Sequence, residues 1–422
     1  MYLFRLWYFA LFAAALLCHI AAAMDLARTE AGVDRAVAQF KVTERGVLVA
    51  IMDRGIDWEN DDFRNEDGTT RIEYIFDLTD DRGANRPDNP YKVGTIYTKK
   101  EIDTALKEKK QLATRDRQGH GTTTAGIACG SGRNSPEEKY RGVAPDAALL
   151  VVRICADPIP KHRGEPGEEV FWKPERVPVA IDFICAKART LRLPCVMVLN
   201  LGSQSDPSDP TDGTSPLCRK IDATVGPGKK GFVFVTGPGD EGTNRKHKRM
   251  TVLDGKRVKV GTIWDGATAR FNICPGDYVN RTEWTDVKGQ RQTQDKEGKV
   301  GEIWTNSSVG PTADGRIGID CCAPCDSVFT TYNPRSYWAT FEKNLISDGK
   351  GLYGRASAVS AANPFTTGVI ALMLQMDPKL DASEHNCPVK SRIATTGYVE
   401  ALPDPGRFYP IMPKKAGFSR KG

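Results

Sequence analysis

The feature that most constrains this chain is a set of short apolar runs rich in β-branched residues. They read "GVLVAIMD" (46–53), "ALLVVRI" (148–154), "CVMVLNL" (195–201) and "GFVFVT" (231–236). Strands without polar alternation are typical of a parallel sheet that is covered on both faces. Between the second and third runs, residues 177–191 place apolar side chains at helical spacing. Strand, helix and strand in this order predict βαβ units, and therefore an α/β fold with a mostly parallel central sheet.

From about residue 250 to 340 the pattern changes. The segments "RVKVGTIWD", "ARFNIC" and "VGEIWTN" are short, alternating and separated by Gly, Asp and Asn turns, which predicts antiparallel strands. We expect a β-rich insertion here, because the long apolar helix predicted at 364–376 must return to the α/β core. The main domain is thus predicted over 46–422, after a short N-terminal segment at 24–45.

The first 23 residues, "MYLFRLWYFALFAAALLCHIAAA", have a different composition from the rest. One basic residue, Arg5, precedes an apolar run that ends in small residues, as in an export signal cleaved before Met24. We therefore expect the signal peptide at 1–23 and a secreted or periplasmic protein. The alternative is an uncleaved anchor, since Leu6–Ala23 has borderline length for spanning a bilayer.

Composition limits the partners of this chain. It has 422 residues, 40% of them hydrophobic, and a net charge of +6 from 59 basic and 53 acidic residues. This small surplus does not favour nucleic acid or an anionic membrane as a main partner.

Eleven cysteines are present, and one of them, Cys18, lies in the predicted signal. An even number remains, which in an exported chain favours disulfides. Four cysteines occur in apolar segments, where a free thiol acts as a small hydrophobic side chain: Cys129, Cys155, Cys185 and Cys195. For "CCAPC" (321–325) we expect a disulfide-pinned loop, because a zinc knuckle would need a second half that is missing.

Three residues far apart in the sequence form a candidate catalytic set. Asp53 ends the first predicted strand, at the sheet edge where ligands collect in α/β proteins. His120 stands between two glycines that allow close backbone approach, and it opens a small-residue helix in "GHGTTTAGIACG". Ser360 precedes the apolar helix in "SAVSAANPFTTGVIALML". A serine needs a base with a pKa near 7 to take its proton, and a buried carboxylate to orient that base.

These blocks resemble the subtilisin-like serine peptidases over roughly residues 44–400. The order Asp, His, Ser is that of subtilisin, and "YRGVAPDAALLVVRI" (140–154) follows the histidine block as it does in the family. The resemblance implies a three-layer subtilisin-like fold and an exported endopeptidase that works through an acyl-enzyme on Ser360. It also implies that a polypeptide substrate pairs as an extended strand with Leu199, Asn200, Leu201 and Gly202 and with Thr236, Gly237 and Pro238.

The sequence departs from the family pattern near the nucleophile. Ala358 and Val359 replace glycine and threonine, and Arg54 replaces a small residue after the aspartate. Asp240 stands where the family has the asparagine that stabilises the oxyanion; an ionised carboxylate would repel this charge, so Asp240 must be kept protonated by a dry site to donate. The alternative function is a catalytically impaired relative that binds peptides without cutting them.

No cofactor is expected for catalysis. The acidic loops Asp57–Asp62 and Asp206–Asp212 leave structural calcium as an alternative to solvated turns.

Overall fold

The computed structural model describes residues 24, 26–43, 45–202, 210–242, 250–253, 256–259, 261–294, 296 and 298–380. Outside the described residues lie the predicted signal (1–23), residues 203–209, which include the start of the acidic loop Asp206–Asp212, and the tail from 381.

A six-stranded sheet forms the centre of the molecule, in the order β3-β2-β4-β1-β7-β8. All of its neighbours are parallel except β2 and β3. Its strands are β1 (Leu48–Asp53), β2 (Ile72–Asp77), β3 (Thr95–Thr98), β4 (Ala148–Arg153), β7 (Cys195–Leu199) and β8 (Phe232–Val235). The four apolar runs thus form β1, β4, β7 and β8, as predicted from their burial on both faces.

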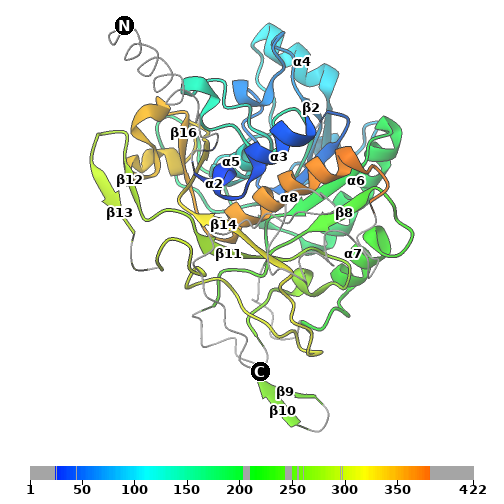
Figure 1. Ribbon diagram of the computed structural model, residues 1–422. Helices are drawn as coiled ribbons and strands as arrows, with labels where there is room; N and C mark the ends of the chain where they lie inside the picture. Colours follow the sequence, from blue (N-terminus) through cyan, green and yellow to red (C-terminus); the bar gives the residue numbers. More distant parts are fainter. Residues whose placement is uncertain are drawn as a thin grey trace, which may run out of the picture.

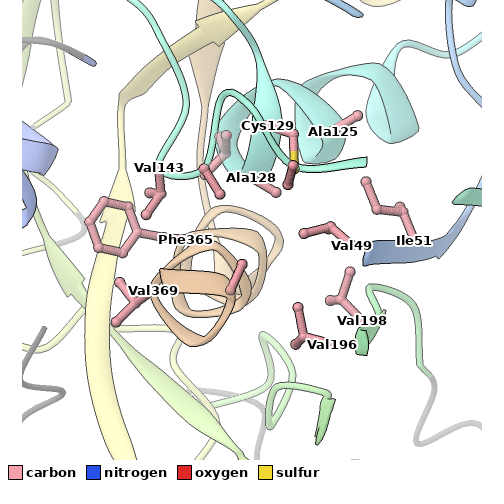
Figure 2. Close-up of a cluster of buried hydrophobic side chains, with 14 of the residues drawn as sticks. Val49, Ile51, Ala125, Ala128, Cys129, Val143, Val196, Val198, Phe365 and Val369 are labelled. Atoms are coloured by element: carbon pink, nitrogen blue, oxygen red, sulfur yellow. The ribbon is translucent and has the colours of Figure 1, made fainter. Parts of the chain in front are cut away.

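Helices cover both faces of this sheet, which gives three layers (Figure 1). On one face Val49 and Ile51 pack with α5 (His120–Cys129) and α8 (Val359–Met376), as Figure 2 shows. On the other face Ala50 and Met52 pack with α6 (Val177–Leu191) and α7 (Pro216–Val225). The helix predicted at 177–191 is confirmed in both bounds. The elements β2, β3, α7 and α4 (Lys99–Glu108) were not predicted. The helix α4 begins with a capping box formed by Thr98 and Glu101.

The N-terminal segment packs into the same domain. Two short helices, α2 (Ala27–Glu30) and α3 (Val33–Phe40), bury Ala27 and Val33 in the core beside α8. The Arg28 guanidinium is buried and donates to the carbonyl oxygens of Gly142 and Val143, the latter at 2.8 Å. The segment therefore completes the packing of the α/β core.

The region predicted as β-rich contains several small strand pairs. Figure 1 shows the hairpins β9 (Met250–Leu253) with β10 (Lys256–Lys259) and β12 (Glu283–Thr285) with β13 (Arg291–Thr293) at the periphery. Between them and the core, β11 (Pro275–Val279) pairs in parallel with β14 (Cys321–Asp326). Two further pairs are β15 (Val328–Thr331) with β16 (Tyr353–Ala356) and β5 (Cys155–Ala156) with β6 (Phe171–Trp172).

Two predictions for this region were wrong. Neither "ARFNIC" nor "VGEIWTN" forms a strand. The first makes a single parallel bridge, from Ile273 to Val235 of β8 in the central sheet, and the second a single antiparallel bridge, from Ile303 to Tyr278 of β11. "CCAPC" is the strand β14, in which Cys321 and Cys325 pack in the core with α8. Its three cysteines form no disulfide, and neither do the other cysteines that the structure describes. Within the described residues no helix has the length and hydropathy needed to cross a bilayer.

Candidate active site

The structure brings Asp53, His120 and Ser360 together at the carboxyl edge of the sheet. Nδ1 of His120 lies 2.7 Å and 2.9 Å from the two carboxylate oxygens of Asp53. Nε2 of the same ring lies 2.8 Å from Oγ of Ser360. The three residues come from the end of β1, the start of α5 and the start of α8, so the alignment depends on how two helices pack on one strand.

The start of α5 is held by a buried carboxylate. Oδ1 of Asp116 accepts the Gly119 N–H at 2.8 Å, and its Oδ2 accepts the Thr122 N–H and hydroxyl, both at 2.7 Å. A Cβ at Gly121 would lie 2.0 Å from the carbonyl oxygen of Gly55, so only glycine permits this close approach of α5 to the end of β1. The glycines around His120 therefore act as predicted, whereas Asp116 was missed.

Asp53 is fully buried and has several donors. Its oxygens accept the Arg54 N–H at 2.6 Å and the Thr124 hydroxyl at 2.8 Å, besides contacting His120. Burial alone would raise the pKa of Asp53, but the charge and hydrogen bond of His120, followed by Arg54, hold it below its usual value. The Arg54 side chain turns away and pairs with Asp157 at 2.6 Å. Asp53 is therefore held as a carboxylate.

Asn200 lies under the nucleophile. Its Nδ2 donates to the Thr124 hydroxyl at 2.7 Å and to the carbonyl oxygen of Ser360 at 3.0 Å, and its Oδ1 accepts from Asn363 at 2.9 Å. Pro364 has no N–H to give the Ser360 carbonyl four residues earlier, so Asn200 replaces that helical bond. Its side chain is thus turned inward, where it supports the backbone of the nucleophile.

Ser360 is not the cap of α8. The capping position is Ala358, whose side chain has no oxygen to accept a helix N–H. Ala358 has φ 70° and ψ −175°, a conformation that is essentially restricted to glycine and costs a residue with a Cβ about 1–3 kcal/mol. The alanine that replaces the family's glycine is therefore strained, directly beside Ser360.

Asp240 faces the start of α8. Its Oδ1 accepts the Val359 N–H at 3.0 Å, so the carboxyl group lies next to Ser360. A helix N-terminus favours negative charge. The contact therefore stabilises the ionised form of Asp240, in which it cannot donate to an oxyanion.

The two predicted substrate segments differ in how many of their backbone N–H and C=O groups are already bonded within the protein. Thr236 donates its N–H to Ile273 O at 3.2 Å, and its carbonyl accepts from Asn272 at 3.2 Å. The carbonyl of Pro238 accepts the Trp264 N–H at 2.8 Å. The Thr236 backbone and the Pro238 carbonyl in the segment Thr236–Pro238 are therefore used within the protein, which leaves the backbone of Gly237 for pairing with a substrate.

The segment after β7 is more open. Leu199 is buried at the end of the strand, Leu201 is half-buried and Gly202 is exposed. Residues 201 and 202 are thus more exposed than Thr236–Pro238, which are buried.

The carboxylates of the first acidic loop bind protein donors. Asp57 contacts Arg335 at 3.2 Å, while Asp62 accepts hydrogen bonds from the hydroxyls of Thr331 at 2.6 Å and Tyr353 at 2.9 Å. In the part of the chain that the structure describes, no group of three or more His, Cys, Asp or Glu side chains is arranged to hold a metal ion.

A buried aspartate, a histidine and a serine in one hydrogen-bonded chain define the arrangement of a serine hydrolase on an α/β sheet. The model of the subtilase family matches residues 44–410. The chain therefore belongs to the subtilase family of serine peptidases.

Individual relatives are distant. The serine protease AprX of Bacillus subtilis (strain 168) is 24% identical over 347 residues, which cover 81% of this chain and 60% of AprX. The CspB protease of Clostridium perfringens has the same fold with a TM-score of 0.59 at 17% identity, over 84% of this chain and 90% of CspB. The S41 psychrophilic protease aligns with a TM-score of 0.52 at 17% identity, over 87% of this chain and 91% of its own. These structures establish the fold class.

Proposed function

We propose that this chain is an exported serine endopeptidase that hydrolyses polypeptides through an acyl-enzyme. The observation that carries the proposal is the continuous contact from Asp53 through His120 to Ser360, with heavy-atom distances of 2.7 Å and 2.8 Å. Nothing in this proposal requires a cofactor, nucleic acid or stable membrane association. Export rests on the predicted signal at 1–23. Chelation with EDTA, followed by thermal unfolding, tests whether calcium adds stability.

In the proposed mechanism His120 acts first as a base and then as an acid. Nε2 takes the Ser360 proton while Oγ forms a bond to the scissile carbonyl carbon. The same proton then passes to the leaving amine as the C–N bond breaks. Asp53 keeps the Nδ1 proton in place and stabilises the imidazolium. In the second half of the reaction His120 takes a proton from water as the water oxygen bonds to the acyl carbon. The same proton then passes to Oγ of Ser360 as the acyl–oxygen bond breaks and the carboxylic acid leaves.

The oxyanion donors in this mechanism are the Ser360 amide and Asp240. Asp240 can donate only when it carries a proton, and its contact with the Val359 N–H at 3.0 Å favours the charged form. This observation supports the second candidate, a relative that binds peptides and cuts them slowly or not at all.

A fluorophosphonate probe separates the two candidates. Its phosphorus forms a bond to Oγ and releases fluoride only if the serine is activated. We expect rapid labelling of the native chain and loss of labelling in Ser360→Ala, with kcat on peptides falling by on the order of 10⁶.

Ser215→Ala is the matched control, because Ser215 is a true N-cap that accepts the Cys218 N–H at 3.0 Å. This variant should lose about 1 kcal/mol of stability and keep its labelling. A folded native chain that stays unlabelled would refute the peptidase and support the peptide-binding alternative.

A further inference from the structure

The indole ring of Trp264 lies between the two segments that flank Ser360. A Cβ at Gly202 would lie 2.1 Å from Cε3 of Trp264, and a Cβ at Gly239 would lie 2.3 Å from its Nε1. No side chain fits at either glycine without moving the ring or the backbone. The ring therefore fills the space between the chain after β7 and the chain before Asp240.

Trp264 is held in this place by the loop that it contacts. Its N–H donates to the Pro238 carbonyl at 2.8 Å. Its indole Nε1 donates to Oε2 of Glu241 at 2.6 Å, and the Ser308 hydroxyl donates to the same oxygen at 3.3 Å. The Ser308 N–H also bonds the Gly239 carbonyl at 2.9 Å. Hydrogen bonds from both the backbone N–H and the indole N–H thus hold the half-buried Trp264 in place.

Both segments are connected to the nucleophile. Asn200 donates to the Ser360 carbonyl from one side, and Asp240 accepts the Val359 N–H on the other. An acyl group on Oγ, with its carbonyl oxygen at the Ser360 amide and Asp240, has its own side chain directed between the two segments. That side chain meets Trp264.

We propose that Trp264 limits the depth of this pocket and restricts cleavage to bonds that follow small side chains, namely glycine, alanine and serine. This inference rests on the proposed peptidase function. A large aromatic or aliphatic side chain would have to displace an indole whose N–H is bonded to a carboxylate, and the Glu241 oxygen would lose that donor.

The test is a series of succinyl-Ala-Ala-Pro-X-p-nitroanilides with X as alanine, leucine or phenylalanine. For the native chain we expect kcat/KM to be at least about tenfold higher for alanine than for phenylalanine, within the range of an apolar pocket. In Trp264→Ala the ratio should move by at least about tenfold toward phenylalanine. Trp264→Phe, which keeps a ring but not the N–H, should fall between the two and serves if the alanine variant does not fold.

Trp284→Ala is the matched control, because this indole also donates a hydrogen bond, to the Lys343 carbonyl at 2.9 Å, but lies in β12 of the peripheral hairpin. It should leave the ratio unchanged. A native preference for phenylalanine or leucine, or an unchanged ratio in folded Trp264 variants, would overturn the inference. Fluorophosphonate labelling of Ser360 measures activation independently of side-chain size, so a labelled chain with the wrong preference refutes only the role of Trp264. Absence of both labelling and cleavage refutes the proposed function itself.

Discussion

Two buried carboxyl groups, Asp53 and Asp277, show how differently the two sides of this site are built. Both are completely removed from solvent. Asp53 accepts hydrogen bonds from the Arg54 amide and the Thr124 hydroxyl and contacts His120. Neither carboxylate oxygen of Asp277, in β11, has a hydrogen-bond partner among the described residues.

Their pKa values move in opposite directions for this reason. The pKa of Asp53 is lowered despite its burial, whereas burial, and then the charge of Asp240, raise the pKa of Asp277 well above its ordinary value. Asp53 therefore stabilises the fold above the ordinary pKa of a carboxyl and loses this contribution as pH falls. Asp277, whose folded pKa is raised, instead reduces the stability of the fold as pH rises above the ordinary pKa of a carboxyl. Hydrogen-bond donors and nearby positive charge, rather than burial, therefore decide whether a carboxyl group inside this chain is charged.

Among the substitutions that test this contrast, Asp53→Asn should have the largest effect. The amide keeps the shape of the carboxyl group but favours the wrong tautomer of His120, so kcat should fall by about 10⁴-fold. The measurement is kcat on a peptide substrate, with circular dichroism to establish folding. Asp146→Asn, at an exposed carboxyl group, is the control. A folded Asp53→Asn chain with near-native kcat would contradict an orienting role for Asp53.

The next test concerns Asp240, on the side of Asp277. If Asp240 must carry a proton to donate to the oxyanion, native activity should fall as pH rises. Asp240→Asn donates at every pH, so kcat at pH 8 should rise by on the order of 10²-fold and this limb should disappear. Profiles of kcat between pH 5 and 9 measure both effects. Superimposable native and variant profiles would show that the carboxyl does not act as a donor.

The smallest expected effect is on stability, in Asp277→Asn. Because the folded pKa is raised, the native fold loses about 1.4 kcal/mol per pH unit from this group as pH rises from the ordinary carboxyl pKa toward the raised one. The amide cannot ionise, so the variant should gain stability relative to the native chain with rising pH. Denaturant unfolding at pH 5, 6, 7 and 8 measures the difference, with Asp146→Asn as the reference. Cys322 and Cys325 also interact with Asp277, but burial raises the pKa of both thiols, that of Cys322 to about 12, so they stay protonated in this range. Parallel curves for the native chain and Asp277→Asn would refute the assignment.

Four strands of the central sheet, β1, β4, β7 and β8, the helix at 177–191 and the places of Asp53, His120 and Ser360 along the chain follow from the sequence alone. These features depend on local patterns: strands buried on both faces carry uninterrupted apolar runs, and the glycines beside His120 permit a backbone approach that any Cβ would block.

Only the tertiary structure decided the surroundings of those residues. It placed Asn200 under Ser360 as the replacement for the missing N–H of Pro364 and set Trp264 between two glycines. It also left Asp277 without a donor among the residues that the structure describes. It also made "CCAPC" a core strand instead of a pinned loop. The physical reason is that hydrogen-bond partners and pocket walls come from segments many residues apart, and no local pattern records which of them meet.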